Sequence, residues 1–159
     1  MAVRVGQGFD VHPWSDEPGR PLVLGGVVLP GERGLAGHSD ADVVAHAVAD
    51  ALLGAAGLGD IGIHFPDTDS RWRGADSLTL LRHVTGLVRE AGWSVGNVDT
   101  TVILEAPKLG PHKAAMGERL GEVVGAPVSV KAKRAEGLGA LGRGEGVACF
   151  AVALLVGLE

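Results

Sequence analysis

The sequence predicts an α+β fold in which one β-sheet carries helices on one face and packs its other face against another subunit. With 159 residues, 46% of them hydrophobic, the chain is long enough for one domain with a sizeable core. The final apolar segment, "VACFAVALLVG", is apolar at odd and even positions alike, so both faces of that strand must be covered. The three predicted helices suffice for one face only. The alternative to a second subunit is a sheet that curls on itself.

The predicted elements follow one another without an internal repeat, a linker or a domain boundary. In chain order they are a strand over 2–13, a hairpin over 22–29, a helix over about 40–56, a polar loop over 60–74, a helix over about 76–91, a strand over 97–107, a helix over 111–124, a strand over 127–134, a glycine-rich loop over 136–146 and a strand over 147–157.

Individual residues mark several of these boundaries. Gly25-Gly26 predicts the turn of the hairpin. Ser39 and Asp42 resemble a capping pair at the start of the first helix, and Gly57 is a plausible stop. The second helix has an apolar face, formed by Leu78, Leu81, Val84, Leu87, Val88 and Ala91.

Composition excludes several classes of protein. The net charge of -5 argues against a broad nucleic-acid surface, which is normally basic. The single cysteine, Cys149, excludes an intrachain disulfide and a cysteine-rich zinc site. We see no signal peptide and no run of about 18 apolar residues that a membrane helix would need. We therefore expect a soluble cytoplasmic domain with no nucleic-acid or membrane partner.

Two short polar patterns together predict a metal site. In "FDVHP", Asp10 and His12 are two residues apart on a strand and share a face. On the first helix, Asp42, His46 and Asp50 are four apart and form one stripe. Two imidazoles and one carboxylate are a common ligand set for catalytic zinc with an open fourth position, and Asp42 or Asp50 would then orient the histidine. The alternative is a solvated stripe with a local Asp–His pair.

Two further clusters have both a functional and a structural interpretation. His38 and Ser39 precede the first helix, where free N–H groups favour anions, although Ser39 could simply cap the helix. The segment "FPDTD" (65–69) holds two aspartates among turn residues, and an Asx-type turn is the simpler explanation.

The glycine-rich segment "GLGALG" (137–142) matches the dinucleotide fingerprint, but a strand follows it where that motif requires a helix. The dinucleotide-binding hypothesis therefore fails on context. The charged residues around the segment would suit a phosphate and a divalent metal, or else form an exposed loop. They are Lys131, Lys133, Arg134, Glu136, Arg143 and Glu145.

Four stretches resemble the methylerythritol cyclodiphosphate synthase family of non-mevalonate isoprenoid biosynthesis. They are "GFDVHPW", "HSDADVVAHAVADALLGAAGLGDIGIHFPDTD", "NVDTTVILEAPKLGPH" and "GRGEGVACFAVALL", in order over nearly the whole chain. The resemblance implies a lyase that converts 4-diphosphocytidyl-2-C-methyl-D-erythritol 2-phosphate to 2-C-methyl-D-erythritol 2,4-cyclodiphosphate and CMP. It also implies one mixed sheet in a ferredoxin-like, chorismate-mutase-like homotrimer, with the open face toward the trimer axis and active sites between subunits.

The resemblance also implies roles for individual residues. Zinc ligands fall on Asp10, His12 and His46, and a magnesium or manganese ligand falls on Glu136. Substrate contacts fall on Asp10, His12, His38, Ser39, Asp60, Gly62, Phe65, Pro66, Asp67, Thr68, Asp69, Ala106, Pro107, Lys108, Leu109, Lys133, Arg134, Ala135, Glu136, Ala140 and Arg143. Among these, Phe65 to Asp69 match a mobile substrate loop and Ala106 to Leu109 match the cytidine pocket. His38, Lys131 and Arg134 are the expected catalytic residues, which offset charge in the transition state.

The chain departs from the family in one loop. Where the family commonly has Thr-Thr before the metal-binding glutamate, this chain has Lys133-Arg134-Ala135 before Glu136. Arg134 could replace the missing hydroxyl by its charge. Ala140 stands where the family often has an aromatic residue that lines a cavity on the trimer axis, so lipid-diphosphate binding in that cavity is left open.

Two other functions compete with the cyclising lyase. One is a zinc hydrolase that activates water at Asp10, His12 and His46, and inorganic phosphate release would support it. The other is a non-catalytic scaffold or metal-storage module, which would hold zinc without turnover. The lysine-bearing "APKLGPH" segment and the glycine-rich loop favour the lyase, because a scaffold needs neither.

Overall fold

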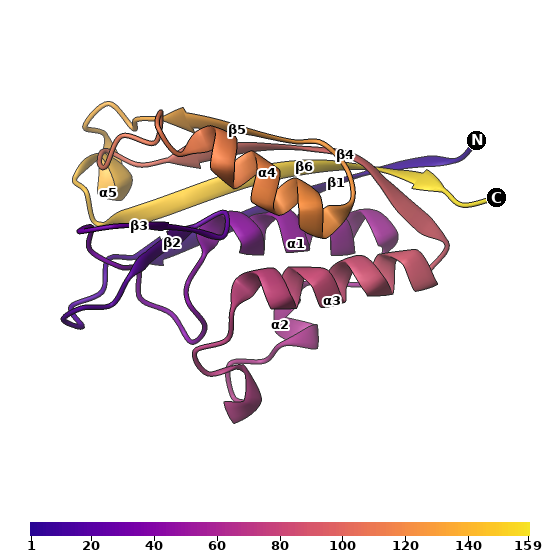
Figure 1. Ribbon diagram of the computed structural model, residues 1–159, viewed down its shortest axis with the longest axis horizontal. Coiled ribbons are helices and arrows are strands. Elements are labelled where there is room, and N and C mark those ends of the chain that lie inside the picture. Colours follow the sequence, from indigo (N-terminus) through magenta and orange to yellow (C-terminus); the bar gives the residue numbers. More distant parts are fainter.

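A computed structural model describes all residues, 1–159, and is built on one mixed four-stranded sheet (Figure 1). The strand order is β1 (Val3–Pro13), β6 (Gly146–Gly157), β4 (Trp93–Ile103) and β5 (Val128–Lys133). Both β1 and β4 run antiparallel to β6, whereas β5 runs parallel to β4. The predicted α+β class is confirmed.

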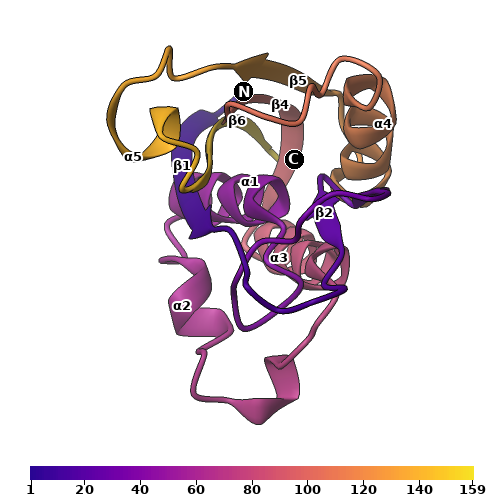
Figure 2. The ribbon, with the colours of Figure 1, turned by 90° about the vertical axis from the view of Figure 1, so that its left-hand side faces the viewer.

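Three helices cover one face of this sheet, as the sequence predicts (Figures 1 and 2). Helix α1 (Val43–Ala56) packs against β1 and β6, and α4 (Lys113–Val124) packs against β5. Helix α3 (Ser77–Glu90) lies against α1 and α4. None of the helices combines the length and the apolar character needed to cross a membrane.

Alternation along β1 sets how closely α1 approaches the sheet. Gly6 and Gly8 have the same parity as Asp10 and His12, so all four face the helix. A Cβ atom at Gly6 or Gly8 would collide with backbone oxygens of α1, so only glycine permits this approach. The same contact brings His46 of α1 beside the two polar residues of β1.

Helix α1 begins later than the sequence predicts. Asp42 is its N-cap and accepts hydrogen bonds from the backbone N–H groups of Val44 and Ala45, at 3.2 and 3.0 Å. The preceding residue, Ala41, has φ of 58°, and this left-handed conformation cannot continue a helix toward Ser39. The predicted start near residue 40 and the predicted Ser39 cap are therefore wrong, whereas the stop at Gly57 is confirmed.

Asp42 also stabilises the predicted hairpin, which consists of the strands β2 (Leu22–Leu24) and β3 (Val27–Leu29). Gly25 and Gly26 both have positive φ, as their turn requires, and their N–H groups donate to the Asp42 carboxylate at 2.8 and 2.7 Å. One buried carboxylate thus accepts hydrogen bonds from the backbone N–H groups of both a helix start and a turn.

Other boundaries differ modestly from the prediction. The predicted loop over 60–74 contains α2 (Ile61–His64) and a 3-10 turn (Ser70–Trp72), each capped by an aspartate. The predicted glycine-rich loop contains one helical turn, α5 (Gly139–Gly142). Strand β4 begins at Trp93 and ends at Ile103, because the chain turns away before Pro107.

The sheet face away from the helices is apolar over β1 and β6. Phe9 and Phe150 are directly opposed there, with ring centroids 4.9 Å apart, and remain 45% and 44% exposed. Val3, Val5, Val11 and Val152 extend this open face along the same two strands. An exposed apolar surface of this kind marks an interaction site.

Candidate functional site

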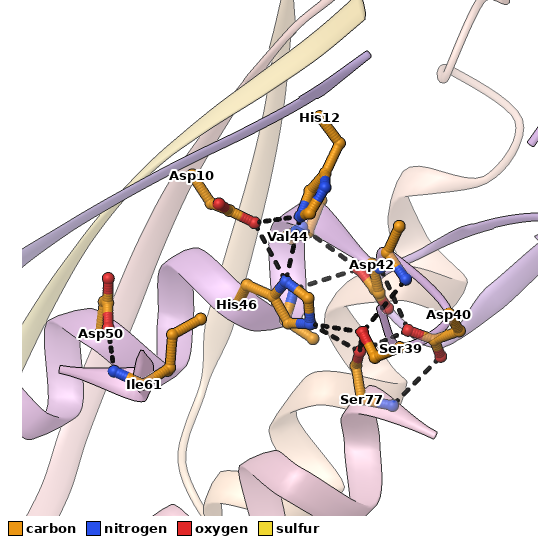
Figure 3. Close-up of polar contacts among 12 residues, drawn as sticks. Asp10, His12, Ser39, Asp40, Asp42, Val44, His46, Asp50, Ile61 and Ser77 are labelled. Carbon is orange, nitrogen blue, oxygen red and sulfur yellow. Dashed lines mark hydrogen bonds and ion pairs between the residues drawn. The ribbon is translucent and has the colours of Figure 1, made fainter. Parts of the chain in front are cut away.

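Three side-chain atoms converge between β1 and α1. The His12 Nε2 and His46 Nδ1 atoms lie 2.9 and 3.0 Å from Asp10 Oδ2, and 3.3 Å from one another (Figure 3). Four ligands held tetrahedrally at about 2.0–2.1 Å from zinc are separated from each other by about 3.3 Å. The three predicted ligands are therefore brought together at nearly the spacing of a zinc site.

Outer hydrogen bonds set which nitrogen each imidazole presents. His12 Nδ1 donates to the carbonyl oxygen of Ala36 at 2.8 Å, which leaves Nε2 free to face the centre. His46 Nε2 lies 2.8 Å from Ser77 Oγ and 3.2 Å from Ser39 Oγ, which leaves Nδ1 free. Both rings thus direct their remaining nitrogen at the same place, where it donates to Asp10 when protonated and would bind a metal ion when deprotonated.

The electrostatics suit a cation as well. Burial works to raise the pKa of Asp10, but hydrogen bonds from His12 and His46 outweigh it and lower that pKa to about 2. Burial works to lower the pKa of His12, and contact with Asp10 outweighs it and raises that pKa. Asp10 is therefore ionised at neutral pH and stabilises a proton on the facing imidazole nitrogens. A divalent cation would replace that proton.

The predicted orienting roles of Asp42 and Asp50 are wrong. The Asp42 carboxylate is fully buried and engaged by the backbone groups of the helix start and the hairpin. Asp50 accepts a hydrogen bond from the backbone N–H of Ile61 at 2.8 Å and so fixes the start of α2 (Figure 3). The stripe formed by Asp42, His46 and Asp50 is therefore not a solvated helix face. Its two aspartates do not orient the His46 ring either.

A cavity of about 610 Å³ opens beside the three converging atoms. This volume is typical of a site for a small organic ligand. Nine of the predicted site residues other than His46 line it, namely Asp10, His12, His38, Ser39, Gly62, Phe65, Pro66, Asp67 and Thr68. The predicted residues Asp60 and Asp69 lie next to this lining and cap α2 and the 3-10 turn.

The segment over 65–69 forms one wall of the cavity. His38 Nε2 contacts the carbonyl oxygen of Asp69 at 3.1 Å, and the Phe65 ring packs edge-on against Trp72, with centroids 4.9 Å apart. The predicted Asx-type turn is present, because Asp69 accepts from the N–H of Arg71 at 3.0 Å. This contact of His38 therefore links the segment before α1 to the cavity wall.

Other predicted residues lie away from this cavity within one chain. Ala106 and Pro107 line a separate cavity of about 250 Å³ together with Trp14 and Glu105. None of the residues over 131–143, nor Lys108 or Leu109, lines the main cavity.

The two cations predicted to be catalytic are paired with carboxylates. Lys131 Nζ lies 2.6 Å from Asp99, and Arg134 Nη2 lies 2.9 Å from Glu105. Glu105 also accepts from the Ala135 N–H at 2.7 Å, so it anchors the loop that departs from the family. Hydrogen bonding to Arg134 lowers the pKa of Glu105, which is ionised at neutral pH.

Glu136 differs from these paired residues. It is exposed, it has φ of 54°, and its carboxylate takes part in none of the hydrogen bonds or ion pairs of the structure. A non-glycine residue in this left-handed conformation is uncommon, and strained positions of this kind cluster at functional sites. The free carboxylate is available to a ligand.

Sequence patterns missed two residues of the site, Ser77 and Asp40. Ser77 directly follows Asp76, the cap of α3, in "ADS", and Asp40 lies two residues before Asp42, the cap of α1, in "SDAD". Their arrangement depends on α3 packing against α1. The only signal in the sequence was the Asp76–Ser77 pair at the start of the helix predicted over about 76–91. Buried Cys149 adds no nucleophile, because burial raises the pKa of its thiol.

Comparison with known proteins agrees with this geometry. The chain is 58% identical over 156 residues to a 2-C-methyl-D-erythritol 2,4-cyclodiphosphate synthase of Symbiobacterium thermophilum, covering 96% of this chain and 98% of the relative. It is 59% identical to the synthase of Bordetella petrii, covering 96% and 94% of the two chains.

Solved structures show the same fold. The bifunctional IspDF of Campylobacter jejuni superposes with a TM-score of 0.94 at 41% identity, over 99% of this chain and 43% of that one. The CDP complex of Plasmodium falciparum IspF gives a TM-score of 0.85 at 32% identity, over 99% and 98% of the two chains. The model of the YgbB family matches residues 3–156. The chain therefore belongs to the YgbB family.

Proposed function

We propose that this protein is a 2-C-methyl-D-erythritol 2,4-cyclodiphosphate synthase of isoprenoid precursor biosynthesis. The observation that carries the proposal is the convergence of Asp10, His12 and His46 at the edge of a cavity of about 610 Å³. Relatives covering almost the whole chain have this name, and one solved neighbour holds CDP. The substrate is 4-diphosphocytidyl-2-C-methyl-D-erythritol 2-phosphate, and the products are the cyclic diphosphate and CMP.

The bond changes balance within one substrate molecule. An oxygen of the 2-phosphate attacks the β-phosphorus, and the bond from that phosphorus to the oxygen bridging it to the α-phosphorus breaks. The electron pair leaves with CMP. Because both reacting groups belong to one molecule, the main task of the protein is to hold them in line and to exclude water.

The residues of the cavity, together with Glu136 of the neighbouring subunit, are suited to that task. The carboxylate and two imidazoles, Asp10, His12 and His46, would hold zinc, and the free carboxylate of Glu136 would hold magnesium or manganese. Such ions, when bound, supply Lewis-acid polarisation of phosphate oxygens and offset the charge of the leaving group. His38 and Ser39 bind the phosphate end of the substrate, and the wall over 65–69 closes over it.

The remaining site residues come from a neighbouring subunit in a homotrimer. The apolar open face of β1 and β6 supports this assembly, because it leaves Phe9 and Phe150 half exposed in a single chain. The partner then supplies its cytidine pocket, Ala106 to Leu109, and its loop with Lys131, Lys133, Arg134, Ala135, Glu136, Ala140 and Arg143. We also propose that Asp60 and Gly62 contact the ribose, and that the protein acts in the cytoplasm, where its charged substrate would be made.

The activity itself can be tested by chromatography of CMP released from the cytidine diphosphate substrate. The proposal expects release that stops when a chelator removes divalent ions and resumes when zinc and magnesium are restored. Release that persists unchanged in metal-free buffer would contradict the metal-assisted mechanism.

Glu136→Gln is expected to raise the magnesium concentration needed for half-maximal turnover by roughly 10-fold, because the amide lacks the charge that binds a hard cation. The measurement is a magnesium titration of turnover at fixed zinc. Glu145→Gln is the matched control, since Glu145 is also exposed on this loop but is paired with Arg143 at 2.6 Å. An unaltered titration for Glu136→Gln would remove this residue from the role.

A further inference from the structure

His46 is the first member of a hydrogen-bonded chain that leads away from the cavity. Its Nε2 atom lies 2.8 Å from the Oγ atom of Ser77, the first residue of α3. Ser77 is only 1% exposed, and its hydroxyl donates to the carboxylate of Asp40 (Figure 3). The backbone N–H of Ser77 donates to the other oxygen of the same carboxylate at 3.1 Å. We refer to these three residues as the Asp40–Ser77–His46 chain.

The chemistry of these groups fixes the direction of the hydrogen bonds. An ionised carboxylate only accepts, so Ser77 directs its single hydroxyl proton to Asp40. The Ser77 oxygen is then left to accept, and the only ring proton that can reach it is on His46 Nε2. The neutral, metal-binding form of His46 is thereby held in the tautomer whose Nδ1 lone pair faces Asp10 and His12.

Ser39 does not offer the same support. Its Oγ atom is 3.2 Å from His46 Nε2, and it accepts instead from the backbone N–H of Ala41, also at 3.2 Å. No carboxylate contacts its hydroxyl. Ser77 is the nearer partner of His46, and its hydroxyl is hydrogen-bonded to the negatively charged carboxylate of Asp40.

We infer that Ser77 and Asp40 are positioning residues that set the affinity of the Asp10–His12–His46 site for its divalent ion. The inference rests on the proposed metal site and adds two residues outside the ligand set. A carboxylate that polarises the Ser77 hydroxyl makes the serine oxygen a better acceptor, and this increases the basicity of the His46 nitrogen that binds the ion. The arrangement also makes metal binding depend on the packing of α3 against α1.

The test is zinc affinity of the full-length protein, measured by competition with a chromophoric chelator. Ser77→Ala is expected to weaken zinc binding by roughly 10- to 100-fold, as loss of an outer partner does in other metal sites. Asp40→Asn should weaken it less, because the amide still accepts from Ser77 without the charge. The double variant should be no weaker than Ser77→Ala alone, since Asp40 acts only through Ser77. Cobalt bound to Ser77→Ala should show a shifted visible absorption spectrum.

Thr100→Val is the matched control. Thr100 is also 1% exposed, and its hydroxyl donates to the carbonyl oxygen of Ser129 at 2.9 Å, away from the cavity. This variant should lose stability without losing zinc affinity, which separates a structural effect from a positioning effect.

The outcomes distinguish this inference from the proposed function. If the unaltered protein and Ser77→Ala bind zinc equally tightly, the inference is overturned and the metal site stands. If the unaltered protein binds no zinc, the proposed site fails and the inference fails with it. If Ser77→Ala does not fold, Asp40→Asn decides alone, and unchanged zinc affinity in that variant would overturn the inference.

Discussion

His46→Ala is expected to abolish stoichiometric zinc binding and to reduce turnover at least about a thousandfold, because the loss of a Lewis acid removes several kcal/mol of transition-state stabilisation. The variant should still fold. His46 lies at the end of the glycine-lined contact between α1 and β1, and its ring nitrogens contact polar groups of Asp10, Ser39 and Ser77. Zinc content by elemental analysis, turnover by CMP release and the circular dichroism spectrum measure the three expectations.

The control for this variant is His112→Ala, which removes an imidazole at the start of α4, away from the converging atoms. It should retain one zinc ion per chain. A His46→Ala protein that keeps its zinc, or one that keeps full turnover without it, would show that the three converging atoms are not the functional metal site.

Phe150→Glu is expected to convert the proposed trimer to monomers and to reduce turnover at least about a hundredfold, because the site would lose the residues proposed to come from the partner. The substitution places a charge in the centre of the open face, opposite Phe9. Burying that charge between subunits without a partner is strongly unfavourable. The monomer should fold, since this face of the sheet is already exposed in the single chain. Light scattering coupled to size-exclusion chromatography gives the mass.

Val28→Glu is the comparison variant, because Val28 is 54% exposed on the β2–β3 hairpin and does not belong to the open face. It should remain trimeric and active. If Phe150→Glu also remains trimeric, the open face is not the subunit interface. A monomeric Phe150→Glu with full turnover would show that the site is complete within one chain.

Local patterns predicted the convergence of Asp10, His12 and His46 because most of the signal is short-ranged. Alternation along a strand places Asp10 beside His12, and only the approach of His46 needed a tertiary assumption. The sheet, its three covering helices and the hairpin followed from periodicity and turn residues in the same way.

The support of the site could not be predicted because it depends on contacts between distant residues. Ser77 is 31 residues from His46 and 37 from Asp40, and only the packing of α3 against α1 brings them together. Asp42 was misassigned for a related reason. Spacing puts it on the same helical stripe as His46, but the left-handed Ala41 makes Asp42 the helix cap and turns its carboxylate to the hairpin.

The most direct test of the proposed function is phosphorus NMR of the complete reaction with the cytidine diphosphate substrate, zinc and magnesium. Cyclisation predicts two coupled resonances of a cyclic diphosphate together with the resonance of CMP, in equal amounts and without inorganic phosphate. Inorganic phosphate or an acyclic diphosphate as the main product would contradict cyclisation and would favour a metal hydrolase. An unchanged spectrum with a zinc-loaded protein would contradict catalysis and favour a metal-storage role.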